Sequence, residues 1–517
     1  MQENECKKFS LDQAINDLYE WLKEKNLENI ETSPLKLILS ANKNEGRCVI
    51  ATKNVEPNTN LIQVPINLLI NHRLSFKNKE FLEFFEFCHQ NRTKGSYKIT
   101  RLDGLYLYLI AEKLDENSSL QKFINTMPKS FDTPEYFNDE LILCLPDYLR
   151  EDIQMRLKKL NHRFASILQY MKNFQASYGS DNKTIKLILD NFNFDVFRWA
   201  FCSVNSRCFH IKEKEILNQE EAEMSNKFFG KLNNIKESSL KYCESLSEFK
   251  RQFEANDEIR NNLCCLIPFL DFMNHSFSPN SFAQFDMEKK LFIIKSQLRD
   301  ENSNESIDEE SYPIKENKQV YITYGYHENK TLLIEYGFIL NENAYDKVLF
   351  KYEDFSEFLV SNEYEDAMWR KSIEDQLLLD FSCNKTTGPS WFLLKMLDLI
   401  NFINTISLPD QAIEDIESPK KKSKSKLNRV TSSVKTYTYS DESLNCEKIK
   451  PLFNSLLNKY KKSLDLSLTK LEGFKSTQSQ NHNYHLDMSI EFCKLQLEIV
   501  EFNLTLVNDT DRWKEIF

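Results

Sequence analysis

Glycine is scarce in this sequence: 9 of 517 residues are glycine, well below the usual ~7%. No two of these glycines lie within five positions of each other, so neither a GxGxxG nor a GxxxxGK pattern occurs. Both patterns place glycines close together where the backbone must approach a phosphate group. We therefore expect neither a Rossmann-type dinucleotide site nor a P-loop nucleotide site.

The sequence also lacks the spacings by which metal sites are usually recognised. Its 12 cysteines are scattered, no pair is spaced CxxC, and only Cys264 and Cys265 are adjacent. Its 8 histidines include no HExxH and no zinc-finger pair. This distribution favours reduced, mostly buried thiols and predicts a protein without a metal ion.

Excess positive charge and long apolar runs are missing too. The 67 basic and 78 acidic residues give a formal net charge of −11, so the chain lacks the basic field on which non-specific nucleic-acid binding depends. No apolar run approaches the ~18–20 residues that cross a bilayer, and the first ten residues contain no apolar signal-peptide core. We expect an intracellular monomer, cytoplasmic or nuclear, that binds neither membranes nor nucleic acid directly.

The composition that remains, 41% hydrophobic and 28% charged, suits a folded chain of two to four domains. Strand-like patterns include residues 263–270, 281–285 and 291–294, and apolar residues at helical spacing predict a helix at 11–25. A further helix is predicted near the C-terminus, where apolar residues recur every three or four positions at Ile490, Cys493, Leu497, Val500 and Leu504. We predict an α+β chain in which small β-sheets are split by a helical insert and followed by an all-α C-terminal domain. The predicted boundaries are an N-terminal helical segment at 1–30, sheet-forming parts at 31–80 and 261–340, the insert at 81–260, and the C-terminal domain at 341–517 with a disordered insertion at 418–443.

Two segments carry polar side chains at the ends of apolar strands. Residues 263–279 (LCCLIPFLDFMNHSFSP) run from an apolar strand into a turn that contains an Asp, an Asn and a His. Residues 320–338 (VYITYGYHENKTLLIEYGF) combine a strand ending in Tyr-Gly, a polar turn and an amphipathic helix ending in a second Tyr-Gly. Taken separately, the first also fits Asp and Asn capping the end of an element, and the second fits core tyrosines whose hydroxyl reaches water.

Together, these segments resemble the SET domain. DFMNHS is similar to the Asn-His motif of that family, YITYG to its catalytic-tyrosine strand, and EYGF to the aromatic position that follows. Residues 44–65 (NEGRCVIATKNVEPNTNLIQVP) resemble its N-terminal hairpin, while residues 123–136 and 198–209 resemble the helical insert of one branch. That branch includes plant Rubisco large-subunit methyltransferase and related protein lysine methyltransferases, and the similarity covers roughly residues 30–340.

The resemblance implies an enzyme that uses S-adenosyl-L-methionine to methylate a lysine side chain in a protein substrate, whether a histone or another protein. The implied cofactor-binding residues are Glu45, Gly46 and Arg47 in the turn, Arg207 at the cofactor carboxylate, and Asn274 and His275 at the adenine and amino end. Close backbone approach to a ligand is a physical reason for a glycine at Gly46. An ordinary hairpin would also explain Gly46, and a surface salt bridge would also explain Arg207.

Catalysis is assigned by the same resemblance to Tyr324, and the walls of the lysine channel to Phe209, Asp271, Phe285 and Tyr336. Methyl transfer from a sulfonium to an amine is an in-line displacement, so the enzyme mainly aligns the reacting atoms and excludes water. Oxygen atoms near the methyl group add weak C–H···O contacts of about 0.5–1 kcal/mol each. A desolvated aromatic channel beside the sulfonium also lowers the pKa of the target lysine.

Two other functions remain open at this point. The chain is also compatible with a histidine methyltransferase, although the histidine-methylating relative of this branch carries a polar amide residue near the position of Phe209. It is further compatible with a SET fold that binds a lysine-containing segment without methylating it, because Cys48 stands where relatives usually carry a glycine. The acidic stretch 300–310 attracts lysine-rich partners or is only a solvated loop, and the basic cluster 420–426 is a nuclear-import signal or a linker.

Overall fold

The computed structural model of the chain describes residues 11–25, 27, 30, 32–39, 46–179, 181–229, 262–297, 313–358, 380–406, 444–477 and 483–516. Glu45, the stretch 300–310 and the insertion 418–443 lie outside these residues. The chain divides into two compact units. The sheet-bearing unit consists of Met1–Tyr136, Gln154–Tyr326 and Glu335–Gly337, and the C-terminal unit consists of Phe137–Ile153, His327–Ile334 and Phe338–Phe517.

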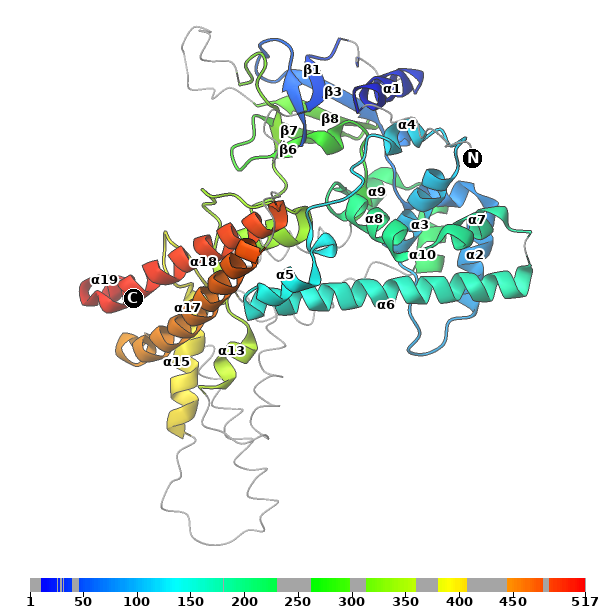
Figure 1. Cartoon of the computed structure of the whole chain (residues 1–517). Helices are drawn as coiled ribbons and strands as arrows, with labels where there is room; N and C mark the ends of the chain where they lie inside the picture. The colour runs from blue at the N-terminus through cyan, green and yellow to red at the C-terminus, as the bar shows by residue number, and fades with distance from the viewer. Residues whose placement is uncertain are drawn as a thin grey trace. The chain divides into compact units, whose positions relative to one another are not determined.

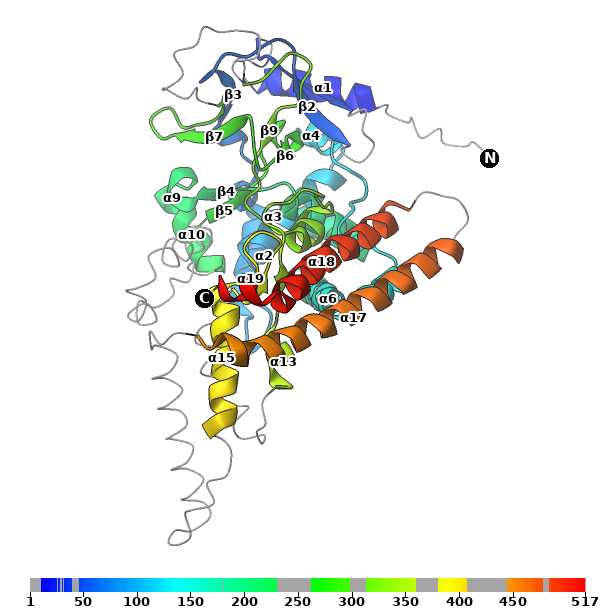
Figure 2. The same ribbon diagram turned by 90° about the vertical axis from the view of Figure 1, so that its left-hand side faces the viewer.

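The sheet-bearing unit contains a two-stranded and a three-stranded antiparallel sheet. After helix α1 (Leu11–Glu24), strand β1 (Leu35–Leu39) pairs with β2 (Arg47–Ala51). Strand β3 (Asn60–Pro65) pairs with β8 (Leu291–Ser296), which pairs in turn with β7 (Ser281–Asp286). Residues from the beginning of the chain and from beyond residue 280 therefore share one sheet, and Figures 1 and 2 show these blue and green strands together.

Two shorter strand pairs complete the unit. Strand β4 (Phe209–Lys212) runs antiparallel to β5 (Asn262–Cys265), and the two-residue strand β6 (Asn274–His275) runs parallel to β9 (Tyr321–Ile322). Between β5 and β6 lies a short 3-10 helix, Leu270–Phe272. These two pairs carry most of the segments on which the family resemblance rests.

A group of helices lies in the sequence between the two halves of the sheets. Asparagine side chains cap α2, α7 and α8, and Thr100 and Asp103 form a reciprocal capping box at the start of α3. Helix α3 belongs to the core, since Leu105, Tyr106 and Leu107 are all at most 1% exposed. The helices are α2 (Lys79–Gln90), α3 (Arg101–Leu114), α4 (Gln121–Ile124), α6 (Asp147–Tyr178), α7 (Lys183–Asn191), α8 (Phe194–Asn205), α9 (Glu213–Ile216) and α10 (Gln219–Phe229).

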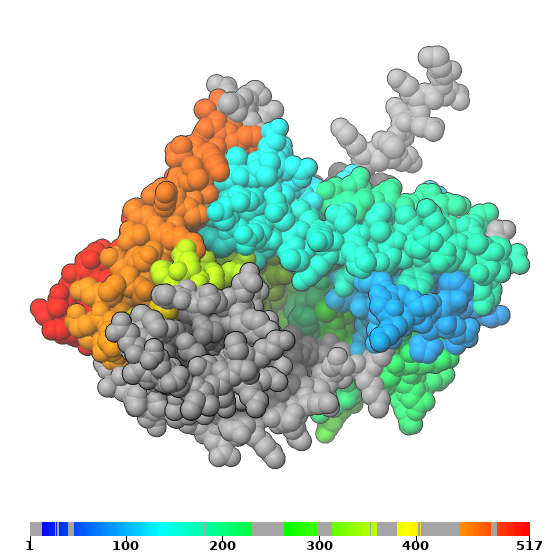
Figure 3. All heavy atoms as spheres, turned by 90° about the horizontal axis from the view of Figure 1, so that it is seen from below, coloured from blue at the N-terminus to red at the C-terminus, as the bar shows by residue number. Residues whose placement is uncertain are grey.

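The C-terminal unit is built mainly from long helices. Helices α17 and α18 lie side by side in both ribbon views. On α18, Ile490, Cys493 and Val500 of the predicted apolar stripe are buried, whereas Leu497 and Leu504 are partly exposed. The outer side of α17, orange in Figure 3, forms part of the surface. The elements are α5 (Asp139–Cys144), α12 (Asn329–Thr331), β10 (Val348–Leu349), α13 (Tyr352–Ser356), β11 (Ser382–Cys383), α15 (Trp391–Ile406), α17 (Cys446–Thr477), α18 (Tyr484–Asn508) and α19 (Thr510–Lys514).

The predicted α+β class is confirmed, and three details differ from the prediction. Strand β4 falls inside the range expected to be helical, because a four-residue strand shows too little alternation to be recognised without its partner β5. The two-residue strands β10 and β11 pair within the domain expected to be all-α. The strand expected over 263–270 ends at Cys265, before Pro268, which has no N–H to donate, and Phe269, which adopts φ +77°.

Within the described residues, no helix is long and apolar enough to cross a membrane.

Gly337 provides a test of how tightly the sheet-bearing unit is packed. Its φ is +78°, and a Cβ added there would lie 2.6 Å from the carbonyl carbon of Asp132 and 2.8 Å from the backbone nitrogen of Thr133. We expect Gly337→Ala to lower the free energy of unfolding by at least about 2 kcal/mol, because neither backbone can yield easily. Denaturant unfolding measures the change.

Gly473 is the matched control for this substitution. It occupies an exposed position of α17, and no atom of the described residues lies within 4 Å of the place that an added Cβ would take. Gly473→Ala should be neutral or should stabilise by up to about 1 kcal/mol, since alanine favours a helix interior. Equal stability of the two variants would contradict the close packing at Gly337.

Candidate active site

The parallel pairing of β6 with β9 brings the two motif segments together. Asn274 lies opposite Tyr321 and His275 opposite Ile322. The side chain of Asn280 reinforces this pairing: its amide oxygen accepts the backbone N–H of Tyr321 at 2.8 Å, and its amide nitrogen donates to the carbonyl of Gln319 at 2.9 Å. Polar residues that are far apart in the sequence therefore occupy one short ladder.

Tyr324 follows directly from this ladder and is fixed at both ends. Its backbone N–H donates to Nδ1 of His275 at 3.0 Å, and its hydroxyl donates to the carbonyl oxygen of Met273 at 2.8 Å. Its ring centroid lies 5.2 Å from that of His275 and 4.9 Å from that of Tyr336. The tyrosine is thus held between the Asn-His segment and the second Tyr-Gly.

Burial of Tyr324 and the hydrogen bond to His275 determine where the protons of these two side chains lie. Burial raises the pKa of Tyr324 to about 12, the nearby Arg207 opposes this shift and Asp271 adds to it, so the phenol is neutral at physiological pH. Because Nδ1 of His275 accepts a hydrogen bond, a neutral His275 carries its proton on Nε2. His275 therefore positions the backbone of Tyr324.

Next to Tyr324, the half-buried Arg47 and Arg207 and the buried Asp271 form a charge cluster. Nη1 of Arg207 donates to the backbone oxygen of Asp271 at 2.7 Å and lies 3.4 Å from its carboxylate Oδ2. Burial raises the pKa of Asp271 to about 6, although both arginines act to lower it. Burial, followed by repulsion from Arg207, lowers the pKa of Arg47 to about 10. Two cations therefore share one desolvated carboxylate.

The charge cluster leaves hydrogen-bonding capacity unused. In the part of the chain that the structure describes, Nε of Arg47, Nε of Arg207 and Oδ1 of Asp271 are buried and have no hydrogen-bond partner. Buried polar atoms without partners are rare and costly, and at a functional site they commonly mark where a ligand binds. The atoms here offer two donors and one acceptor to a ligand that has both an anionic and a cationic group.

Gly46 adds open space beside the same cluster. It immediately precedes Arg47, adopts φ +61°, and would place a Cβ with no atom within 4 Å among the described residues. The amide nitrogen of Asn274 lies 3.4 Å from the backbone oxygen of Arg47 and donates to the side chain of Gln319 at 2.8 Å. The start of β2 thus borders the Asn-His segment and exposes backbone there.

Comparison with known proteins agrees with this geometry. No protein-family model matches the chain. It is 25% identical over 497 residues to SET domain-containing protein 4 of Artemia parthenogenetica, covering 95% of this chain and 96% of that protein. The human protein of the same name is 21% identical over 385 residues, which cover 74% of this chain and 71% of the human protein.

Solved structures give the same result for the fold. The SET domain of LSMT bound to lysine and AdoHcy superimposes with a TM-score of 0.57 at 15% identity, covering 98% of this chain and 93% of that one. Rubisco LSMT bound to AdoMet gives a TM-score of 0.55 at 17% identity, with 97% and 93% covered. The chain therefore has the fold of the LSMT SET domain and is similar over most of its length to SET domain-containing protein 4.

A further similarity involves only part of the chain. Actin-histidine N-methyltransferase of Rattus norvegicus is 26% identical over 166 residues, which is 32% of this chain and 26% of that protein. The two SET domain-containing proteins 4 named above instead match 95% and 74% of the chain.

The aromatic residues assigned to the substrate channel of the SET domain form two groups. Tyr336 ends a π-helical turn and contacts Tyr324. Phe209 begins β4, and its ring centroid lies 5.5 Å from that of Phe292, which is the cross-strand partner of Phe285. Phe209, Phe285 and Tyr324 all pack against the same hydrophobic core. Whether the two groups line one channel stays a prediction.

Some residues that shape the candidate site were not predicted from the sequence. Asn280 and Gln319 join the two motif segments, yet single polar residues next to short strands give no distinctive signal. Met273 contributes only its backbone oxygen, which no side-chain pattern reveals. The turn at Phe269 had a usable signal in the sequence, because the preceding Pro268 disfavours the continuous strand that was predicted there.

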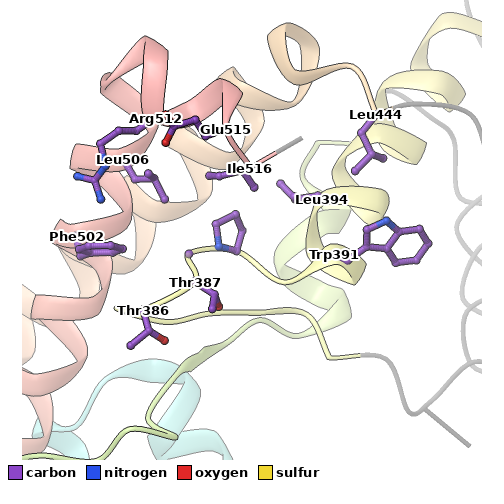
Figure 4. A pocket seen from close by; sticks show the side chains of 12 residues that line it. Thr386, Thr387, Trp391, Leu394, Leu444, Phe502, Leu506, Arg512, Glu515 and Ile516 are labelled. Atoms are coloured by element: carbon purple, nitrogen blue, oxygen red, sulfur yellow. The ribbon is translucent and has the colours of Figure 1, made fainter. Parts of the chain in front are cut away.

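A hollow of about 700 Å³ in the C-terminal unit contains none of the site residues. Figure 4 shows that α15, α18 and α19 contribute to its lining, with Arg512 and Glu515 as its charged side chains. Apolar side chains such as Trp391 and Phe502 make up much of the rest. This hollow is therefore no part of the candidate active site.

The raised pKa of Asp271 predicts a specific pH dependence of stability. Its folded-state pKa of about 6 lies above the ordinary 3.8, so the folded chain binds this proton more tightly than the unfolded chain does. The wild type should lose stability relative to Asp271→Asn as the pH rises from about 4 to about 6, by at most about 3 kcal/mol. Unfolding of both proteins across this pH range measures the difference, and a constant difference would contradict the burial of the carboxylate.

Proposed function

We propose that the chain is an S-adenosyl-L-methionine-dependent protein methyltransferase that methylates the side-chain amine of a lysine in a protein substrate. The observation that carries this proposal is Tyr324, whose hydroxyl is fixed beside Met273 and next to buried polar atoms that lack partners. The two solved SET structures with bound AdoMet or AdoHcy support the choice of cofactor. The expected compartment, cytoplasm or nucleus, and the monomeric state stay predictions.

The residues of the charge cluster suit this cofactor. S-adenosyl-L-methionine supplies a methyl group on a positively charged sulfur, and it also carries a carboxylate, an amino group and an adenosine. The unpaired N–H groups of Arg47 and Arg207 suit the carboxylate, and the open space at Gly46 allows close approach to the backbone. The unpaired oxygen of Asp271 suits an ammonium group, which the cofactor and the target lysine both possess.

Tyr324 acts in this proposal through the position of its oxygen. Its hydroxyl hydrogen is directed to Met273, so the oxygen presents its lone pairs to weak C–H···O contacts with a polarised methyl group. Its raised pKa argues against a role as a general base. The tyrosine therefore aligns the methyl group with the incoming nitrogen.

In this proposal, the aromatic residues favour the neutral form of the lysine amine. Tyr336, Phe209 and Phe285 would surround the amine with apolar surface, which disfavours its charged form and lowers its pKa. The positive charges of Arg47 and Arg207 act in the same direction. The proton leaves to solvent before the neutral nitrogen attacks.

Histidine methylation is the second candidate, and it rests on the partial similarity to actin-histidine N-methyltransferase. Two observations favour lysine. The relatives that match most of the chain are SET domain-containing proteins 4, and the solved LSMT structures bind lysine or methylated lysine. The aromatic Phe209 also offers no amide to hold an imidazole.

The deciding experiment is transfer of a labelled methyl group from S-adenosyl-L-methionine onto a cell extract, followed by mass spectrometry of the labelled peptides. Label on lysine supports the proposal, whereas label on histidine supports the second candidate. Absence of transfer together with absence of cofactor binding in calorimetry would leave the non-catalytic binding module.

Tyr324→Phe tests the catalytic assignment. We expect turnover to fall at least about tenfold, because the substitution removes the aligned oxygen while keeping the ring. Cofactor affinity measured by calorimetry should change little. Tyr326→Phe is the matched control, since Tyr326 is 66% exposed, and it should retain full turnover. Equal turnover of the two variants would reject the role of Tyr324.

Gly46→Ala tests the cofactor turn, with Gly95→Ala as its control. Both glycines are exposed, adopt positive φ, and have no atom within 4 Å of an added Cβ. Both substitutions should therefore destabilise folding to a similar extent, by about 1 kcal/mol. Only Gly46→Ala should weaken cofactor binding, by about tenfold, in calorimetry. The same affinity in both variants would remove Gly46 from the cofactor site.

A further inference from the structure

The face of the β4–β5 pair that carries Cys208, His210 and Cys264 gathers three metal-ligating side chains. His210 lies directly opposite Cys264, and Cys208 is two residues before His210, so all three side chains lie on the same side of the ladder. Each offers one ligand atom, and these atoms all lie within 4.8 Å of one another. Figure 2 shows β4 and β5 next to each other.

The distances approach those of a zinc site. Zinc–sulfur bonds of about 2.3 Å and zinc–nitrogen bonds of about 2.0–2.1 Å place tetrahedral ligand atoms about 3.5–3.8 Å apart. The sulfur of Cys264 lies 3.8 Å from Nδ1 of His210, and the other pairs lie within 4.8 Å. A shift of about 1 Å or less in any pair, within the reach of side-chain rotation, completes the geometry.

A disulfide between Cys208 and Cys264 fits this arrangement less well. The two residues are diagonal neighbours across the ladder, because Phe209 is paired with Cys265 and His210 with Cys264. Diagonal neighbours are about 7–8 Å apart, whereas disulfides usually join Cα atoms about 4.4–6.8 Å apart. Two longer metal–ligand bonds span the distance without moving the strands.

We propose that Cys208, His210 and Cys264 bind one Zn²⁺ through two thiolates and one imidazole, with a fourth position left for water. Each thiol loses its proton to solvent on binding, so the two thiolates neutralise the charge of the ion. Two soft sulfur ligands and one imidazole are a donor set that selects Zn²⁺ over Mg²⁺ or Ca²⁺.

The surroundings are compatible with metal uptake. His210 is exposed and both cysteines are partly exposed, so an ion can reach the cluster from solvent. The thiolate is the form that binds metal ions.

The site also adjoins two residues of the candidate active site. Cys208 stands between Arg207, which binds Asp271, and Phe209, which contacts Phe292. A bound ion would fix the start of β4 and with it the backbone of both neighbours. The role of the ion is therefore to stabilise the strand pair that positions these residues.

The test uses the full chain, purified under reducing conditions and stripped of metal. Zn²⁺ is titrated against a chromophoric chelator, and Co²⁺ serves as a spectroscopic probe because thiolate ligands give it a charge-transfer band in the near ultraviolet. We expect one ion per chain, the thiolate band with Co²⁺, and a higher melting temperature in the presence of Zn²⁺.

Cys264→Ser and His210→Ala are the test variants, and Cys446→Ser is the control because Cys446 is a partly exposed cysteine at the start of α17. Each test variant should bind Zn²⁺ at least about 100-fold more weakly, since losing a ligand costs more than losing a neighbour that orients one. The control should bind as the wild type does. His210→Ala keeps the test decisive if Cys264→Ser fails to fold, because His210 is exposed.

Three outcomes would overturn the proposal: no binding to the wild type, unchanged affinity in both test variants, or a Cys208–Cys264 disulfide in non-reduced peptide maps of a protein that takes up no metal after reduction. None of these readouts requires methyl transfer, so failure here is distinguishable from failure of the proposed function. The same titration also tests the metal-free state expected from cysteine and histidine spacing.

Discussion

The two-residue parallel pairing of β6 with β9 is the interaction on which the candidate site depends. It joins segments 274–275 and 321–322, and the side chain of Asn280 ties the same segments together from the side. Once they are joined, His275 meets the backbone of Tyr324, and the hydroxyl of Tyr324 reaches Met273. A ladder this short is stable because polar side chains complete the hydrogen bonding that the strands alone would leave unmade.

The charge cluster shows what this arrangement costs the fold. A carboxylate with no exposed side-chain surface lies beside two arginines, and burial outweighs the attraction of both in setting the pKa of Asp271. Unpaired buried atoms on all three side chains add to the cost. Buried polar atoms without partners commonly lie where a ligand can bond to them. The unpaired atoms and the raised pKa of Asp271 are therefore consistent with the proposed cofactor binding at the charge cluster.

The sequence predicted much of the fold for identifiable reasons. Alternation predicted β7 and β8 to within two residues, and helical periodicity predicted α1 and the buried stripe of α18. It missed β4, whose four residues show no pattern of their own. Among the candidate site residues, Tyr324, Asn274 and His275 were predicted because they stand in motifs that resemble those of a family, whereas Asn280 and Gln319 were not predicted because their roles consist only of contacts across the sheet.

The sequence by itself determined the class of the fold, the family resemblance, and the residue types available for methyl transfer, because these depend on local patterns and short motifs. Only the tertiary structure decided which polar atoms remain unpaired, since that depends on burial by residues far away in the chain. It also decided that His210 and Cys264, which are 54 positions apart, face each other across two strands. Spacing along the chain predicts metal ligands only when they lie in one segment, whereas strand pairing brings ligands together from two.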